Sequence, residues 1–368
     1  MLAWLRLLRS RRVGVTTFFR LIREHGSAQA ALEALPEVAR AAGVKGYQPC
    51  PPPVVEQELR AAHYAGAKFI AFGSADYPAQ LSDIQDPPPF LWAIGDASLL
   101  QRSTVALVGA RNASSLGTRM ARRLAEELGN KGHVVVSGLA RGVDTAAHAA
   151  ALKTGTIAVM ASGVDVIYPT ENTVLGEEIG RNGLRISEAP MGMSPQARHF
   201  PQRNRIVSGL ARAVVIVEAA TRSGSLITAR SALDQGREVL AVPGHPFDAR
   251  ASGCNMLIRD GATLVRGAND VIELLGEIPV ASEPETPAPE PADLAADVPA
   301  PQPEPRSPTE IRALHQQILD RLGPSPVAED QLIRDLALPA AAVTPELVNL
   351  ELEGRVQRQP GGLVNRID

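Results

Sequence analysis

The chain has 368 residues, with 37 lysine and arginine side chains, 40 aspartate and glutamate side chains and a formal net charge of −3. This length predicts two or three domains, and the two cysteines, Cys50 and Cys254, are too few for a disulfide framework and fit a reducing cytoplasm. No apolar run approaches the ~18–20 residues of a membrane span, so no membrane association is expected. The negative net charge argues against a nucleic-acid partner if the charges are spread evenly along the chain.

The charges are not spread evenly. Residues 102–275 carry 20 basic and 15 acidic side chains, a net charge of +5, and 18 of the 20 cations are arginine. Residues 276–307 carry one basic and seven acidic side chains, and residues 308–368 carry six and nine. Arginine binds phosphate well, but a high-GC genome also explains an excess of arginine over lysine. The positions of the arginines must therefore distinguish a phosphate-binding role from codon usage.

A proline-rich segment follows the basic region. Ten of the 30 prolines lie between Pro279 and Pro308, a stretch without aromatic residues. Such a composition cannot bury enough apolar surface to offset the entropy of ordering, so residues 276–307 are predicted to be a disordered linker before a tail domain at 308–368.

The first 53 residues predict a small helical domain, with helices at Val15–Glu24, Ala28–Leu35 and Pro36–Ala42. Helices separated by glycine can hold a DNA backbone through loop amides, and they also form ordinary packing domains. These residues favour the packing role.

Short β-branched runs alternate with helix-like segments between residues 104 and 275. This alternation predicts an α/β fold with a parallel sheet covered on both faces, whose strand-to-helix loops meet at one sheet edge. The runs are Thr104–Gly109, His133–Gly138, Thr156–Gly163, Leu184–Ala189, Ala213–Ala219, Glu238–Gly244 and Thr263–Gly267.

Two of these loops combine glycine, arginine and a helix start. The loop after the first run has Gly109, Arg111 and serines at the helix start, which suits phosphate, although a well-capped helix with a surface arginine explains it equally well. It lacks the G-x-G-x-x-G pattern, so a dinucleotide site is poorly supported. The next loop has Gly138 and Arg141, and Arg141 either reaches phosphate or pairs with Asp144.

Two later segments extend this basic edge. Residues 198–230 contain six arginines and one acid, Glu218, with Phe200 among them, and a basic groove with an aromatic platform suits single strands. Ser223, Gly224 and Ser225 begin another helix.

The seven histidines are scattered without the spacing of metal ligands or of a nucleophilic site, so no metal, cofactor or catalytic residue is predicted.

Together the motifs resemble the bacterial DNA-processing protein A (DprA/Smf) family, most strongly over residues 54–275. The resemblance implies an extended Rossmann-like domain at 54–275, a SAM or helix-hairpin-helix-like domain at 1–53 and a winged-helix domain at 308–368. The residues that carry it are Val108–Arg111, Ser137–Asp144, Phe200–Leu210, Ser223–Ala229, Val242–Gly244, Gly253–Ile258, Gly261–Ala262, Asp76–Pro78 and Asp86–Pro88.

The resemblance also implies the function and its residues. It implies a non-enzymatic, homodimeric, cytoplasmic protein that binds and protects single-stranded DNA and loads RecA onto it in natural transformation. The chain departs from the family pattern at two positions. Ala110 replaces a usual serine, which removes a hydroxyl donor, and Leu116 replaces a frequent tyrosine, which removes a ring that could stack on a base. The implied DNA-binding residues are Gly109, Arg111, Gly138, Arg141, Arg198, Phe200, Arg203, Asn204, Arg205, Ser223, Gly224 and Ser225. The candidate dimer contacts, which helix packing explains equally well, are Met256, Leu257, Ile258 and Leu264.

The tail and two alternatives complete the predictions. The tail's third helix, 343–352, has acids and no cation, which favours a protein contact over duplex reading. One alternative is a nucleotide N-glycosidase of the lysine-decarboxylase-like group, but aligning its P-G-G-x-G-T-x-x-E motif puts Thr228 where the catalytic glutamate belongs. The other is a recombination scaffold that does not touch DNA.

Overall fold

A computed structural model of the chain describes residues 1–276, 308–322, 327–336, 338, 340–353, 355–359 and 363–366. The predicted linker therefore lies outside the described residues, except for Gly276. The chain divides into two compact units, Met1–Leu35 with Gln48–Ala281, and Pro36–Tyr47 with Ser282–Asp368. In the described part, no helix has both the length and the apolar character needed to cross a membrane.

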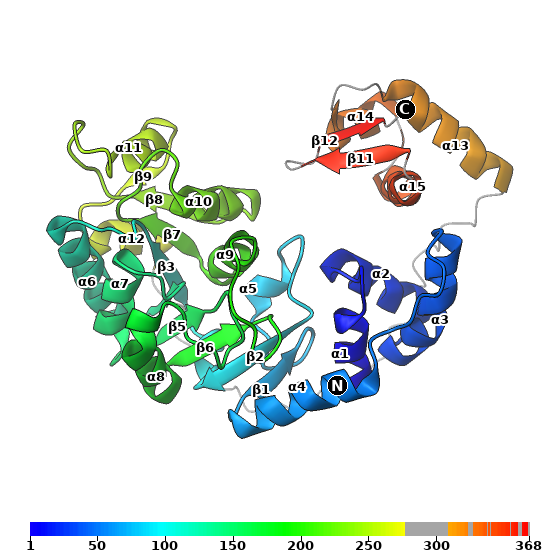
Figure 1. Ribbon diagram of the computed structural model, residues 1–368. Helices are drawn as coiled ribbons and strands as arrows, with labels where there is room; N and C mark the ends of the chain where they lie inside the picture. The colour runs from blue at the N-terminus through cyan, green and yellow to red at the C-terminus, as the bar shows by residue number, and fades with distance from the viewer. Residues whose placement is uncertain are drawn as a thin grey trace, which may run out of the picture. The chain divides into compact units, whose positions relative to one another are not determined.

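A nine-stranded sheet forms the body of the first unit, with strand order β1-β2-β6-β5-β4-β3-β7-β8-β9 (Figure 1). The seven predicted strands are confirmed and pair in parallel, whereas β1 and β2 pair antiparallel at one edge and were not predicted. The sheet is therefore mixed rather than parallel throughout. Its strands are β1 (Lys68–Ala71), β2 (Phe90–Gly95), β3 (Thr104–Val108), β4 (Val134–Ser137), β5 (Thr156–Val159), β6 (Leu184–Ser187), β7 (Ala213–Ile216), β8 (Glu238–Ala241) and β9 (Thr263–Leu264).

Helices cover both faces of this sheet (Figure 1). Successive strand residues point to opposite faces, so Val105 and Leu107 pack with α6 and α7 while Ala106 and Val108 pack on the side of α9 and α10. This two-sided burial explains why the strands are continuous apolar runs. The helices are α5 (Ala79–Ser82), α6 (Ser115–Asn130), α7 (Val143–Ala151), α8 (Thr173–Asn182), α9 (His199–Leu210), α10 (Gly224–Asp234), α11 (Ser252–Arg259) and α12 (Ala268–Leu275), with 3₁₀ turns at Ala97–Gln101 and Thr170–Asn172.

The strand order changes direction at β3. The chain runs from β3 outward through β4, β5 and β6, then returns to place β7 on the other side of β3. The loops that leave β3 and β7 consequently diverge, and such a switch point is where open α/β sheets form their ligand crevice.

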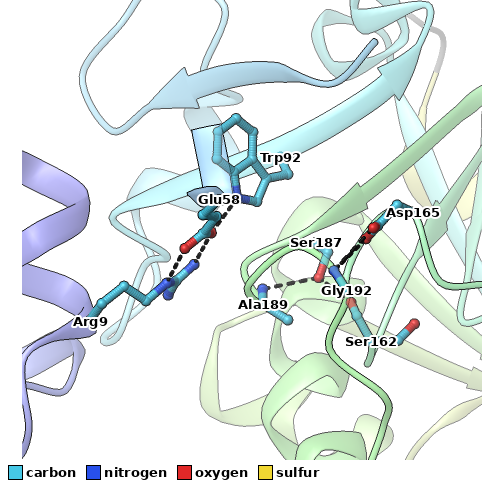
Figure 2. Close-up of polar contacts among 8 residues, drawn as sticks. All are labelled: Arg9, Glu58, Trp92, Ser162, Asp165, Ser187, Ala189 and Gly192. Atoms are coloured by element: carbon cyan, nitrogen blue, oxygen red, sulfur yellow. Dashed lines mark hydrogen bonds and ion pairs between the residues drawn. The ribbon is translucent and has the colours of Figure 1, made fainter. Parts of the chain in front are cut away.

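The N-terminal helices are α1 (Leu2–Arg9), α2 (Val15–His25), α3 (Ala28–Ala41) and α4 (Pro52–Tyr64). Pro36 does not divide two helices as predicted, because α3 continues through it. Figure 2 shows how α1 is fastened to the sheet: Arg9 donates to the Glu58 carboxylate at 2.7 and 2.9 Å, and the indole of Trp92 in β2 donates to it at 3.0 Å.

The second unit contains the tail. As predicted, three helices precede a β-hairpin, and a short strand, β10, adds to it in the order β10-β12-β11. Leu314, Ile318, Leu347 and Val356 are among its buried residues. Its elements are α13 (Pro308–Arg321), β10 (Val327–Ala328), α14 (Glu329–Leu336), α15 (Ala340–Leu352), β11 (Val356–Gln359) and β12 (Leu363–Arg366).

Candidate functional site

A pocket of about 620 Å³ lies at the carboxyl ends of β3, β4 and β7, beside α9. We call it the switch-point pocket. It brings together nine of the twelve predicted binding residues, which are Gly109, Arg111, Gly138, Phe200, Arg203, Asn204, Ser223, Gly224 and Ser225.

One wall of the switch-point pocket combines a cation with an aromatic ring. The Arg111 guanidinium lies 5.0 Å from the centroid of the Phe200 ring, which in turn lies 6.0 Å from the ring of Tyr168. Arg111 and Arg222 are exposed, and neither forms an ion pair with a residue of the described part. Two cations in this pocket are therefore available to an anionic ligand.

The start of α6 does not offer the anion site that its serines suggested. Ser114 caps the helix by accepting from the Gly117 amide at 3.0 Å, and the Glu218 carboxylate accepts from the Ser114 amide and hydroxyl at 2.9 and 2.5 Å. A carboxylate from the loop after β7 thus already occupies this positive helix end. The start of α6 is thus capped within the protein, while Arg111 of the same loop is exposed and lines the switch-point pocket.

The start of α10 is more open. The Ser223 hydroxyl caps α10 by accepting from the Ser225 amide at 3.3 Å and lies 2.6 Å from the Ser225 hydroxyl. A Cβ on Gly224 would meet no atom within 4 Å, so there is free space beside this helix end. The Asn204 amide reaches the Gly224 carbonyl at 3.5 Å, which links α9 to α10 across the pocket.

Arg203 forms part of the framework of the pocket. Its Nη1 donates to the carbonyls of Gly138 and Val159, both at 2.5 Å, and the residue is only 6 % exposed. A Cβ on Gly138 would lie 2.1 Å from that nitrogen, so glycine is required where the guanidinium passes. Burial lowers the pKa of Arg203 to about 10, against the opposing effect of Asp144.

Asp144 holds the loop after β4. It accepts from the amides of Gly138 and Ala140 at 3.1 and 3.2 Å, and burial raises its pKa. It does not pair with Arg141, the alternative considered from the sequence. Arg141 forms an exposed ion pair with Glu171 instead.

Arg141, Arg198 and Arg205 lie outside the switch-point pocket. Arg198 is exposed and donates to the His199 ring at 3.4 Å. Arg205 is on the other side of α9, where it pairs with Glu188 at 2.5 Å and Asp86 at 3.1 Å. Because α9 turns by about 100° per residue, the dense run of arginines is divided between its two sides.

A second pocket of about 440 Å³ lies on that other side, between the α1–α2 turn and the ends of β5 and β6. We call it the helical-domain pocket. Its arginines are Arg9, Arg203 and Arg205, and each of them is ion-paired or hydrogen-bonded within the protein.

Two arginines of the switch-point pocket, Arg222 and Arg250, were not among the predicted DNA-binding residues, although Arg222 belongs to the arginine-rich run at residues 198–230. Arg222 directly precedes the serines at the start of α10, so its position next to that loop was an available signal. Arg250 lies in the loop after β8 and pairs with Asp248 at 3.1 Å. Only the folding of that loop against the pocket reveals it.

The candidate dimer contacts and the position of the N-glycosidase glutamate lie in or near the hydrophobic core or on the sheet edge. Leu257 and Ile258 are partly buried against the core under the sheet, and Leu264 on the edge strand β9 is 40 % exposed. Thr228, at the position of the N-glycosidase glutamate, is buried in the pocket wall. Within the described ranges, no three His, Cys, Asp or Glu side chains gather as a metal site.

The chain is similar to known proteins over most of its length. Residues 68–276 match the family model of DNA recombination-mediator protein A, residues 1–61 a DprA-like N-terminal HHH domain and residues 282–362 a DprA winged helix domain. The DNA processing protein DprA of Bacillus subtilis is 43 % identical over 228 residues, which cover 61 % of this chain and 77 % of that protein.

Two solved structures are also similar. The X-ray structure of DNA processing protein A from Streptococcus pneumoniae has a TM-score of 0.55 and 37 % identity, covering 71 % of this chain and 98 % of that one. The structure of DNA processing protein A from Helicobacter pylori, described for its single-stranded DNA binding mode, has a TM-score of 0.53 and 32 % identity, covering 56 % and 95 %.

Proposed function

This chain belongs to the DprA/Smf family of DNA-processing proteins, and on that premise we propose that its switch-point pocket binds single-stranded DNA. The observation that carries the proposal is the combination, in one crevice, of an aromatic ring with two arginines that have no ion-pair partner among the described residues. Arg111 and Arg222 supply charge for phosphates, and Phe200 supplies a face on which a base can stack.

The chemistry of the pocket favours a single strand over other anionic ligands. A base is exposed for stacking only where it is not paired, so a ring beside the cations is useful for a single strand and not for a duplex backbone. Stacking is tolerant of sequence because every base has a π-face. The protein in this proposal therefore binds many sequences with similar affinity, and its affinity falls as salt rises.

The biological role that we propose is to protect incoming single strands and to load RecA onto them during natural transformation, without catalysis by this chain. A homodimer is part of this proposal, with the exposed Leu264 as the better placed of the four apolar candidates. The related Helicobacter pylori protein, whose structure is described for its single-stranded DNA binding mode, supports the choice of ligand.

The direct test is binding of a fluorescent ~30-nucleotide thymidine strand, followed by anisotropy at ~0.1 M salt. We expect Arg111→Ala to raise the Kd about tenfold, because it removes both a phosphate contact and the cation beside the stacking ring. Arg181→Ala is the matched control, since Arg181 is an exposed arginine that pairs with Glu177 on α8, outside the pocket.

If Arg111→Ala and Arg222→Ala both bind the strand as the wild type does, the pocket is not the DNA site. The same strand, incubated with RecA in the presence and absence of this protein, tests the delivery role through the rate of RecA assembly.

A further inference from the structure

The loop between β8 and α11 carries an exposed aromatic side chain, Phe247, that does not line the switch-point pocket. Phe247 is 94 % exposed, more than any other large apolar side chain in the described part of the chain. Its ring lies 5.5 Å from that of His245, which is also exposed. Exposing a whole phenylalanine ring to water is unfavourable, so a ligand that covers it gains apolar contact.

The position of this loop connects the ring to the switch-point pocket. The loop leaves the carboxyl end of β8, a strand parallel to β7, so it lies on the same sheet edge as the pocket loops. Arg250, three residues after Phe247, lines the pocket. The start of α11 packs against the loop after β7, where the Gly253 amide donates to the Ala219 carbonyl at 2.8 Å.

The loop is also held in place by its own hydrogen bonds. Gly244 and Asn255 exchange two bonds, of 3.1 and 3.0 Å, which tie the loop to α11. The Asp248 amide donates to the His245 carbonyl at 2.9 Å, and the Asp248 carboxylate accepts from the Arg250 amide at 2.9 Å. Phe247 is therefore presented by an ordered turn, and a ligand that stacks on it loses little entropy by ordering the loop.

We propose that Phe247, with His245 beside it, is a second base-stacking platform for the single strand, at the rim of the switch-point pocket. The inference rests on the proposed function. Phe200 already provides one ring in the pocket, with the Arg111 guanidinium 5.0 Å from its centroid, and Phe247 provides a second ring on the loop whose Arg250 lines the pocket and pairs with Asp248. A strand leaving the pocket past Arg250 then places a further base on Phe247.

The experiment compares Phe247→Ala with wild type on two strands of equal length, one of thymidines and one of abasic sites. Loss of one stacked base raises the Kd for the thymidine strand about tenfold, whereas the Kd for the abasic strand is unchanged because its phosphates are intact. Tyr64→Ala is the matched control, since Tyr64 is 87 % exposed on α4 and does not line either pocket.

A second variant reports stacking directly. In Phe247→Trp, the added indole fluorescence is quenched by the thymidine strand and not by the abasic strand. Thermal unfolding and sedimentation accompany both variants, and neither the midpoint nor the oligomeric state changes if Phe247 serves only the strand.

The possible results separate the inference from its premise. If Arg111→Ala weakens binding and Phe247→Ala does not, Phe247 is not a stacking platform, and the switch-point pocket is still supported as the DNA site. If neither variant weakens binding, the proposed function fails as well. Equal weakening on thymidine and abasic strands overturns the stacking role, because the lost contact then does not depend on bases. A changed oligomeric state of Phe247→Ala also overturns it and assigns the ring to a contact between copies of the chain.

Discussion

Both pockets beside α9 contain arginines, and the pockets differ in whether these arginines are paired with carboxylates. In the helical-domain pocket, Arg9 pairs with Glu58, and Arg205 pairs with Asp86 and Glu188. In the switch-point pocket, Arg111 and Arg222 have no acidic partner among the described residues. An arginine that already satisfies a carboxylate cannot bind phosphate without leaving that carboxylate unpaired, so the number of arginines in a pocket does not measure its capacity for DNA.

The largest expected effect is at the residue that the two pockets share. Arg203→Ala removes the buried guanidinium that holds the carbonyls of Gly138 and Val159 and faces Asp144. We expect the free energy of unfolding, measured by urea titration, to fall by about 3 kcal/mol, because two buried carbonyls lose their donor and the buried Asp144 loses a nearby positive charge. Arg222→Ala, in the same pocket but exposed, changes it by less than ~0.5 kcal/mol. Equal stability of the two variants contradicts a framework role for Arg203.

A smaller effect is expected where the helical-domain pocket joins α1. Burial by itself raises the pKa of Glu58, but the hydrogen bonds from Arg9 and Trp92 outweigh it, so the pKa lies below its ordinary value of 4.5. A carboxyl with a lowered folded pKa stabilises the fold at neutral pH, and this contribution is lost as the pH falls below about 4.5.

Glu58→Gln tests this ion pair. At pH 7 we expect it to lower the free energy of unfolding by about 1.5 kcal/mol, the lower end of the usual contribution of hydrogen bonds to a charged group, because the glutamine oxygen can still accept a hydrogen bond. The difference from wild type shrinks as the pH approaches 3, which urea titrations at several pH values measure. The variant also removes the negative charge beside Arg9, and a rise in strand affinity would show that the Arg9–Glu58 pair opposes DNA binding at the helical-domain pocket.

The smallest effect is expected at Arg141. Its ion pair with Glu171 is solvent-exposed, with side chains 61 % and 58 % accessible, so Arg141→Ala changes the free energy of unfolding by no more than ~0.5 kcal/mol. Because the residue lies outside the switch-point pocket, we also expect the Kd for the thymidine strand to stay within about twofold of wild type. A tenfold weakening would extend the DNA path over the loop between β4 and α7.

Much of the fold could be predicted because the signals are local. The strands β3 to β9 are short apolar runs between helical segments, and this pattern is set by burial on both faces. The antiparallel strands β1 and β2 lie outside that alternation, so the same pattern could not reveal them. Pro36 was a misleading local signal, since α3 accommodates it.

Residue order was enough to predict which loops and which residue types meet at the sheet edge, because parallel strands bring their carboxyl ends together. It also assigned the charges to the correct regions, with the excess of arginine in the α/β domain and the acids in the later segments. Which of these arginines are available to a ligand depends on contacts that form when the chain folds. The Glu218 carboxylate accepts from Ser114 at the start of α6, Glu188 and Asp86 pair with Arg205, and Arg111 lies beside Phe200, all through contacts between residues far apart in the chain. Pairing depends on distance in space, which residue order does not specify.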